Sequence, residues 1–335
     1  MKAIAITQAA TTGNNIDFLK EIDLPVPVAK GHDVLVEVKA ISVNPVDTKV
    51  RAGFSAGMPR VLGWDGVGVV KSIGDAVKLF APGDHVWYAG ALGRPGSNSE
   101  FQLVDERIVA LKPASLDNAS AAALPLTAIT AWELLFDRLG VQENGNEGDV
   151  LLIVGAAGGV GSVLTQLATR LTRMTVIGTA SRPESQKWVR EAGADFVIDH
   201  SKPLTEELAR IGIKEVTHVA SLTNTGQHYQ EMIAALAPQG KLALIDDPEI
   251  LDARPLKTKS ISLHWEFMFT RSMFETSDLL EQHLLLTRIA QLIDKKIIHT
   301  TLGEHFGAIN AENLKKAHAQ IETGRAVGKI VLEGF

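Results

Sequence analysis

Cysteine is absent from the 335 residues of this chain. The chain therefore forms no disulfide, has no thiolate nucleophile and cannot build a zinc site from cysteine ligands. The sequence also lacks a block of lysine and arginine that would follow a phosphate backbone, and its formal net charge is −6 at pH 7. We expect no nucleic acid partner.

Long apolar runs and aromatic residues are scarce as well. No uninterrupted apolar stretch reaches about 18 residues, and the apolar start at Met1–Ile6 is too short for the core of a signal peptide. We therefore expect no membrane partner and a cytoplasmic location. Only two tyrosines occur, Tyr88 and Tyr229, so a tyrosine proton donor has few possible positions.

The length exceeds the size at which one hydrophobic core keeps growing, so two domains are expected. In the first third, short β-type runs alternate with Gly, Pro and Asp, and the clearest are Val34–Val38, Gly66–Val70 and His85–Tyr88. This pattern predicts a β-rich, barrel-like domain. After Pro113 the pattern becomes helical, with Ser120–Leu139 broken once at Pro125. We place a domain boundary there, which assigns residues 1–125 to the first domain.

From Asp149 onward, apolar strands alternate with amphipathic helices, which is typical of a doubly wound parallel α/β sheet. Five strands are predicted, at Val150–Val154, Thr175–Thr179, Phe196–Ile198, Val216–Ala220 and Lys241–Ile245. Residues 126–269 thus form a nucleotide-binding domain of the Rossmann type. The tail adds a helix, Ala311–Glu322, and a strand, Lys329–Leu332. We expect the tail, from about residue 270 to 335, to complete the first domain.

A glycine-rich turn lies between the first of these strands and its helix. Its predicted cofactor-binding residues are Gly155, Ala156, Gly158, Gly159, Val160 and Gly161. Glycines allow a tight turn and a close approach to a diphosphate, whose charge is favoured by the N–H groups and the dipole at the helix start. The alternative is a glycine-rich turn that binds no ligand. The flanking strand and helix favour dinucleotide binding.

The end of the second strand indicates which dinucleotide binds. An acidic side chain there would hydrogen-bond the ribose 2′-OH of NAD, but the strand ends in Thr179-Ala180-Ser181-Arg182. A serine hydroxyl and a guanidinium suit a 2′-phosphate. Ser181 and Arg182 therefore predict NADPH. The alternative is that Arg182 is a solvated charge and that Glu184 binds the ribose.

Five motifs together resemble the medium-chain dehydrogenase/reductase superfamily, and within it the quinone-oxidoreductase-like branch and its zinc-type alcohol dehydrogenase-like proteins. They are Val43–Asp47, Leu62–Gly68, Pro82–Val86, Ala123–Ala128 and the Gly155–Gly161 turn. The resemblance covers the whole chain. It implies a GroES-like β-barrel domain, an inserted Rossmann domain and commonly a homodimer.

Zinc-dependent members of this superfamily bind their metal through cysteines and through the histidine of a Gly-His-Glu triplet. The matching triplet here is Gly63-Trp64-Asp65, and the cysteine position falls near Asn44. A catalytic zinc needs three protein ligands, which these positions do not supply. We predict no zinc, and hence a substrate that stabilises its own negative charge, such as a quinone or an activated enone or aldehyde.

The resemblance also assigns residues to the reaction. It implies that Asn44 and Thr127 lie near the nicotinamide and that the loop with Leu222 and Thr223 closes over it. Asn44 is equally open to a loop-capping role beside Pro45. Tyr88, a catalytic candidate, and Trp64 would line the substrate cleft together with Asp47, although core packing is an alternative for Trp64. Water is the default proton donor.

The predicted function is NADPH-dependent reduction of a quinone, an activated enone or an aldehyde by hydride transfer. Two alternatives stay open: a zinc-dependent alcohol dehydrogenase, and a sensor that binds NADPH without turnover, because a fold does not guarantee activity. The aromatic cluster His264–Phe269 is interpreted as packing or as pocket lining. Histidines such as His200 and His318 show no metal-binding spacing and are interpreted as surface or core residues.

Overall fold

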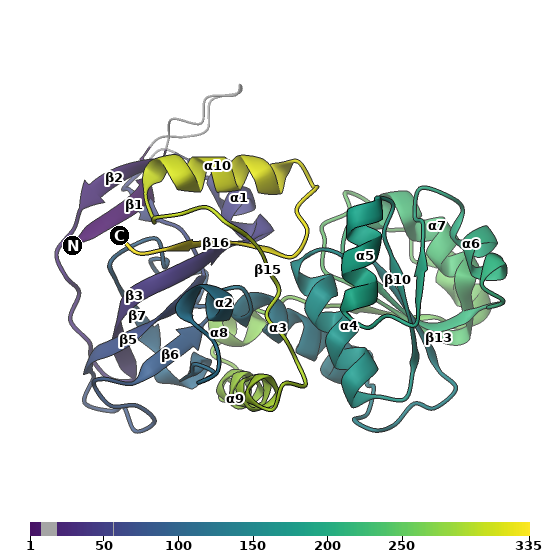
Figure 1. Cartoon of the computed structure of the whole chain (residues 1–335), viewed down its shortest axis with the longest axis horizontal. Coiled ribbons are helices and arrows are strands. Elements are labelled where there is room, and N and C mark those ends of the chain that lie inside the picture. The colour runs from purple at the N-terminus through teal and green to yellow at the C-terminus, as the bar shows by residue number, and fades with distance from the viewer. Residues whose placement is uncertain (8–18, 56) are drawn as a thin grey trace. The chain divides into compact units, whose positions relative to one another are not determined.

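The computed structural model describes residues 1–7, 19–55 and 57–335 (Figure 1). Residue contacts divide the chain into two compact units. Unit 1 comprises Met1–Ile129 and Phe269–Phe335, and unit 2 comprises Thr130–Met268. The architecture is α/β, with a GroES-like β-domain and a parallel-sheet Rossmann domain, as the sequence predicts.

The described residues of unit 1 form two sheets. The smaller has the order β2-β1-β4, and the larger has the order β15-β16-β3-β5-β6-β8, with β7 also paired to β3. The strands of the two sheets are β1 (Lys2–Ile6), β2 (Leu19–Asp23), β3 (Asp33–Val43), β4 (Arg60–Val61), β5 (Asp65–Ile73), β6 (His85–Tyr88), β7 (Phe101–Asp105), β8 (Val109–Leu111), β15 (Leu302–His305) and β16 (Lys329–Glu333). In the middle of β3 the buried Val36, Val38 and Ala40 alternate with the less buried Glu37 and Lys39, so one face of this part of the strand packs into the core.

The C-terminal strand joins the larger sheet of this unit. Figure 1 shows β16, in yellow, beside the purple β3. The pairing is antiparallel and places Ile330 opposite Val43. Lys329, the residue before Ile330, is thereby brought next to Asn44, although the two are separated by most of the chain.

The helices of unit 1 pack around these strands. They are α1 (Pro45–Ala52), α2 (Asn118–Ala122), the start of α3 (Pro125–Trp132), α8 (Thr270–Phe274), α9 (Glu281–Asp294), α10 (Ala311–Glu322) and the short η1 (Glu106–Ile108). Proline opens α1 and α3, where its missing N–H leaves no hydrogen bond unmade. Pro125 therefore starts a helix here, whereas the sequence pattern suggested a break inside one.

The sheet of unit 2 is parallel, with the order β11-β10-β9-β12-β13-β14. Its strands are β9 (Val150–Val154), β10 (Thr175–Thr179), β11 (Phe196–Ile198), β12 (Val216–Ser221), β13 (Leu236–Leu244) and β14 (Ser262–Trp265). The sequence also predicts an apolar strand at Ser260–Leu263, and the structure adds it, as β14, to the edge of the five-strand sheet. The strand β13 begins at Leu236, earlier than the predicted start at Lys241. The segment Pro238–Gly240, which signals a turn in the sequence, therefore lies inside the strand.

Helices cover both faces of this sheet. Figure 1 shows α4 (Gly159–Leu171) and α5 (Pro183–Glu191) on one face, and α6 (Leu204–Arg210) and α7 (Thr225–Ala235) on the other. The short η3 (Arg254–Lys259) precedes β14. Residues Leu151–Val154 of β9 are at most 1% exposed, which explains their continuous apolar run.

One helical stretch is long and apolar enough to cross a membrane by length and composition. It is Asn118–Arg138, made of α2, α3 and the π-helical η2 (Glu133–Arg138). However, 83% of its most apolar window is buried inside the protein. Such burial is typical of a core helix of a soluble protein.

Candidate functional site

The glycine-rich turn follows β9 and leads into α4. Gly155 has φ +86°, and a Cβ there would lie 2.8 Å from Thr223 Cγ2. A Cβ on Gly161 would lie 2.5 Å from the Gly155 carbonyl oxygen, so the first turn of α4 packs directly on the strand end. Gly158 occupies the N-cap position of α4 and has no side chain to cap its N–H groups. These N–H groups are therefore suited to an anion.

The loop after β12 lies against this turn. The Leu222 N–H donates to the Val154 carbonyl oxygen at 3.1 Å, and Thr223 contacts Gly155. The end of β12 is held by Ser221 and Thr225, whose hydroxyl oxygens are 2.7 Å apart. The structure thus brings the predicted residues Leu222 and Thr223 to the Gly155–Gly161 turn, at the point where the strand order reverses.

Two further predicted residues follow β10. The side chain of Arg182 is 39% exposed, and its Nη1 lies 3.8 Å from Glu184 Oε1. Ser181 precedes it and is exposed. Both follow the carboxyl end of a strand adjacent to β9, the edge of the sheet at which such folds bind their ligands.

His200 is a member of this edge that the sequence interpretation missed. Its Nδ1 lies 2.9 Å from Thr179 Oγ1, which also accepts a hydrogen bond from the Gly155 N–H at 3.1 Å. Burial lowers the pKa of His200, and the neighbouring His228 and the cation of Arg182 lower it further, while Asp199 opposes them. The signal available in the sequence was its position two residues after β11.

The predicted catalytic and substrate-cleft residues lie in unit 1 and are buried. Asn44, Asp47, Trp64, Tyr88 and Thr127 are each at most 3% exposed. The Thr127 hydroxyl donates to the Leu124 carbonyl oxygen at 3.0 Å. The Tyr88 hydroxyl has no hydrogen-bond partner among the described residues, and burial raises its pKa, which makes the phenol a weaker acid. The roles assigned to these five residues stay predictions.

Asp65 is the centre of a buried polar cluster in unit 1. Its Oδ2 accepts hydrogen bonds from the Ser42 hydroxyl at 2.6 Å and from Asn44 Nδ2 at 2.7 Å. Its Oδ1 accepts from the Leu126 N–H at 2.7 Å. The Lys329 ammonium lies 3.3 Å from Oδ2. The sequence predicts only a strand at Lys329 and gives no sign that its side chain joins this cluster.

Two members of this cluster have shifted pKa values because they are buried. Burial raises the pKa of Asp47 to about 7. The backbone N–H of Asn44, which donates to the Asp47 carboxylate at 2.8 Å, has the opposite effect and lowers that pKa. Burial also lowers the pKa of Lys329, while Asp65 and Asp47 raise it. The Asn44 amide is used within the cluster, because its Nδ2 donates to Asp65 and its Oδ1 accepts from Lys329 at 2.6 Å.

The described residues do not fit a zinc ion. Within residues 1–7, 19–55 and 57–335, no group of three or more His, Asp or Glu side chains is arranged to hold a metal. The positions that match the zinc ligands of the superfamily carry Asn44 and the buried indole of Trp64. The adjacent carboxylate of Asp65 is already paired with a cation, Lys329.

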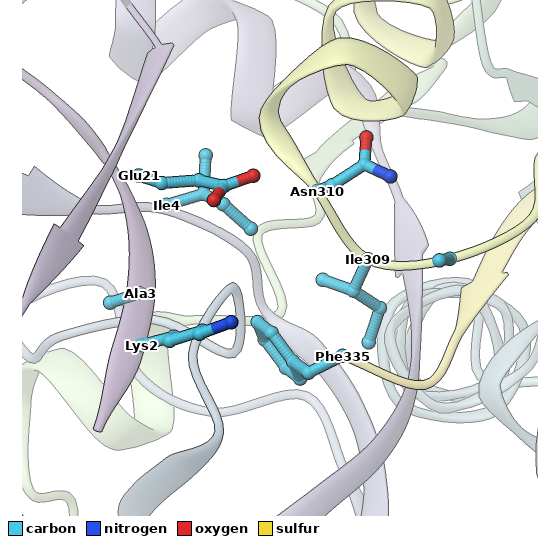
Figure 2. Close-up of a pocket in the computed structure, with 8 residues that line it drawn as sticks. Lys2, Ala3, Ile4, Glu21, Ile309, Asn310 and Phe335 are labelled. Carbon is cyan, nitrogen blue, oxygen red and sulfur yellow. The ribbon is translucent and has the colours of Figure 1, made fainter.

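A small pocket elsewhere in unit 1 does not extend the site. Figure 2 shows its lining, which comes from β1, β2, the segment just before α10 and the C-terminus, with Lys2, Glu21 and Phe335 among the residues. Its volume is about 150 Å³. Small-molecule pockets usually measure about 300–1,000 Å³. None of the predicted site residues lines it.

The chain is similar along its length to known proteins. Residues 30–114 match the family model of the alcohol dehydrogenase GroES-like domain, and residues 192–332 match that of the zinc-binding dehydrogenase. A zinc-type alcohol dehydrogenase-like protein of Staphylococcus epidermidis is 37% identical over 335 residues, covering 99% of each chain. A 2-methylene-furan-3-one reductase of Solanum lycopersicum is 30% identical over 340 residues, covering 96% of this chain and 77% of that protein.

Solved structures agree with these matches. A putative zinc-dependent alcohol dehydrogenase from Rhizobium etli superposes with a TM-score of 0.95 at 51% identity, covering 100% of this chain and 98% of that one. A mycobacterial protein complexed with NADPH superposes with a TM-score of 0.84 at 27% identity, covering 99% of both chains.

Proposed function

Because the chain belongs to the medium-chain dehydrogenase/reductase superfamily, we propose that it is an NADPH-dependent oxidoreductase that works without zinc. Its acceptor would be a quinone or an activated enone or aldehyde. The observation that carries the proposal is the glycine cradle at Gly155–Gly161 together with the cation of Arg182 at the end of the neighbouring strand.

The cradle supports dinucleotide binding because its open surface consists of backbone. The uncapped N–H groups at the start of α4 would bind the diphosphate, and Gly158 leaves room for it. Arg182 would pair with the 2′-phosphate through its guanidinium, and a ring N–H of His200 would add a further donor. A structural relative in complex with NADPH agrees with this choice of cofactor.

The residues at the zinc positions support chemistry without a metal. Bound NADPH would supply a hydride. A conjugated acceptor takes the hydride at carbon and moves the negative charge onto its own oxygen, so it needs hydrogen-bond donors rather than a Lewis acid. Asn44 and Thr127 are the candidates to orient acceptor or cofactor, and water would deliver the proton. The tomato relative, named for a methylene ketone, favours an enone acceptor.

The proposal includes a homodimer in the cytoplasm. The strand β14 is the edge of its sheet, so its outer backbone groups are available for pairing. Trp265 and Phe267, at and just beyond its end, are 51% and 47% exposed. Light scattering should give twice the chain mass, and Phe267→Asp should shift the protein toward monomer. A monomeric wild type would contradict this part of the proposal.

A turnover screen tests the function. The purified protein is mixed with NADPH or NADH and a panel of quinones, enones and aldehydes, and separately with NADP⁺ or NAD⁺ and simple alcohols. The absorbance of the reduced cofactor is followed with and without a chelator. We expect NADPH oxidation with conjugated acceptors, unchanged by the chelator. NADPH binding without turnover would instead favour a sensor. Activity confined to simple alcohols and abolished by the chelator would favour a zinc alcohol dehydrogenase.

A further inference from the structure

A buried ammonium occupies the polar cluster of unit 1. Lys329 is 3% exposed, and its Nζ lies 2.8 Å from the Val43 carbonyl oxygen and 2.6 Å from Asn44 Oδ1. The third neighbour is Asp65 Oδ2 at 3.3 Å. An ammonium has three N–H donors, so each donor has one oxygen. Buried lysines are rare unless they are paired in this way.

The cation is held in place by strand pairing. Lys329 begins β16, and the antiparallel register that sets Ile330 opposite Val43 carries its side chain to the end of β3. Asn44 follows β3 directly and is fixed in an extended conformation before Pro45. The ammonium therefore does not depend on a mobile loop.

The carboxylate of Asp65 connects this cation to three other segments. It accepts hydrogen bonds from Ser42 at the end of β3, from the Asn44 amide and from the backbone N–H of Leu126. Leu126 is in the first turn of α3 and precedes Thr127. An ionised carboxylate accepts all of these bonds, whereas a protonated carboxyl must use one oxygen as a donor. Two of the three predicted catalytic residues are thus connected to Asp65: Asn44 donates to it directly, and Thr127 follows Leu126, whose N–H donates to it.

We propose that Lys329 is a positioning residue for the reduction: its ammonium provides the positive charge that a metal ion would otherwise bring to this cluster. By pairing with Asp65 and with Asn44 Oδ1, it keeps the Asn44 amide in one orientation and the first turn of α3 in place. Removal of Lys329 alone leaves the buried Asp65 without a counter-charge and Asn44 Oδ1 without its donor. The inference rests on the proposed function, since it concerns the same reaction.

Two variants separate positioning from plain charge balance. Lys329→Met should lower the melting temperature and reduce kcat at least about tenfold, because small misplacements of positioning groups have large effects on rate. In Lys329→Met/Asp65→Asn the charge of Asp65 is removed together with that of Lys329, so most of the melting temperature should return. Its kcat should stay low, since an amide at position 65 donates where the carboxylate accepted and turns the Asn44 amide over.

The Kd for NADPH is a measurement that does not depend on the Lys329 cluster, because the glycine cradle at Gly155–Gly161 belongs to unit 2. It should change less than about twofold in both variants. The matched control is Lys71→Met, which removes a half-exposed lysine of β5 paired with Glu37 and should keep kcat, Kd and melting temperature.

Three results would overturn the inference. The first is an unchanged kcat in folded Lys329→Met, and the second is a double variant that regains kcat together with its stability, which would mean that Lys329 only balances charge. The third is a wild type that turns over no acceptor, which would remove the proposed function itself. Turnover by the wild type distinguishes this last failure from the first two.

Discussion

Gly158→Ala should make the protein more stable and NADPH binding weaker. Gly158 has φ −74° and ψ 177°, a conformation that alanine adopts without strain. Its added Cβ would have only the Gly155 carbonyl oxygen within 4 Å, at 3.6 Å, so the folded chain accommodates the methyl group. Alanine restricts the unfolded chain, which should raise the free energy of unfolding by about 0.4–1 kcal/mol. The melting temperature should then rise by about 1–4 °C.

Cofactor affinity should move in the opposite direction. If the diphosphate lies in the cradle, the new methyl group enters the space that it needs. Forcing an extra methyl into a fitted site costs about 1–3 kcal/mol, which corresponds to a rise in Kd of about 5- to 150-fold. NADH should be affected equally, because both cofactors carry the same diphosphate. Thermal unfolding without ligand and fluorescence titration with each cofactor measure the two effects.

Two other glycine variants serve as comparisons for Gly158→Ala. Gly161→Ala should lose stability as well as affinity, because its Cβ would lie 2.5 Å from the Gly155 carbonyl oxygen, which belongs to the backbone and cannot move aside easily. Gly93→Ala has nothing within 4 Å of the added Cβ and should leave NADPH affinity unchanged. Wild-type affinity in a stabilised Gly158→Ala protein would refute the placement of the diphosphate.

Three further predictions concern charge and metal. Arg182→Glu should weaken the binding of NADPH about tenfold or more and that of NADH little, since a carboxylate would face the 2′-phosphate. Arg190→Glu, in the helix α5 that follows Arg182, should change neither affinity. Equal losses for both cofactors would contradict the assignment of Arg182 to the 2′-phosphate. Because the pKa of His200 is lowered in the free protein and a phosphate beside it would raise that pKa, binding takes up a proton. NADPH affinity should therefore rise as pH falls from 8 to 6.5, by up to about tenfold for each unit by which the pKa of His200 is raised on binding. In His200→Gln, the NADPH affinity measured by calorimetry should not change over this pH range. Exhaustive dialysis against a chelator should leave the melting temperature unchanged, and a drop restored by zinc would contradict the metal-free site.

The sequence pattern was sufficient for the parts of the fold that rest on local chemistry. The apolar run of β9, the glycines after it and the helix α10 are each marked by neighbouring residues, and the structure has them where they were predicted. The start of β13 was missed because Pro238 and Gly240 signal a turn locally. In the structure Leu236 pairs with Val216 and Lys241 with His218, and the register shifts between these two pairs. The long-range pairing of Leu236 with Val216 extends the strand to a point that the local pattern does not mark.

The candidate site was only partly visible in the sequence for a similar reason. Gly155–Gly161 and Arg182 form sequence-local patterns at strand ends. Lys329 contacts Asn44 across most of the chain, and only the pairing of β16 with β3 brings the two together. His200 has no motif around it, and its position beside Thr179 follows from the pairing of β10 with β11.

Titration of metal-stripped wild-type protein with NADPH and with NADH, by calorimetry in the presence of a chelator, tests the central claim most directly. We expect one NADPH to bind per chain, more tightly than NADH. No heat of binding, or binding that appears only after zinc is added back, would contradict it.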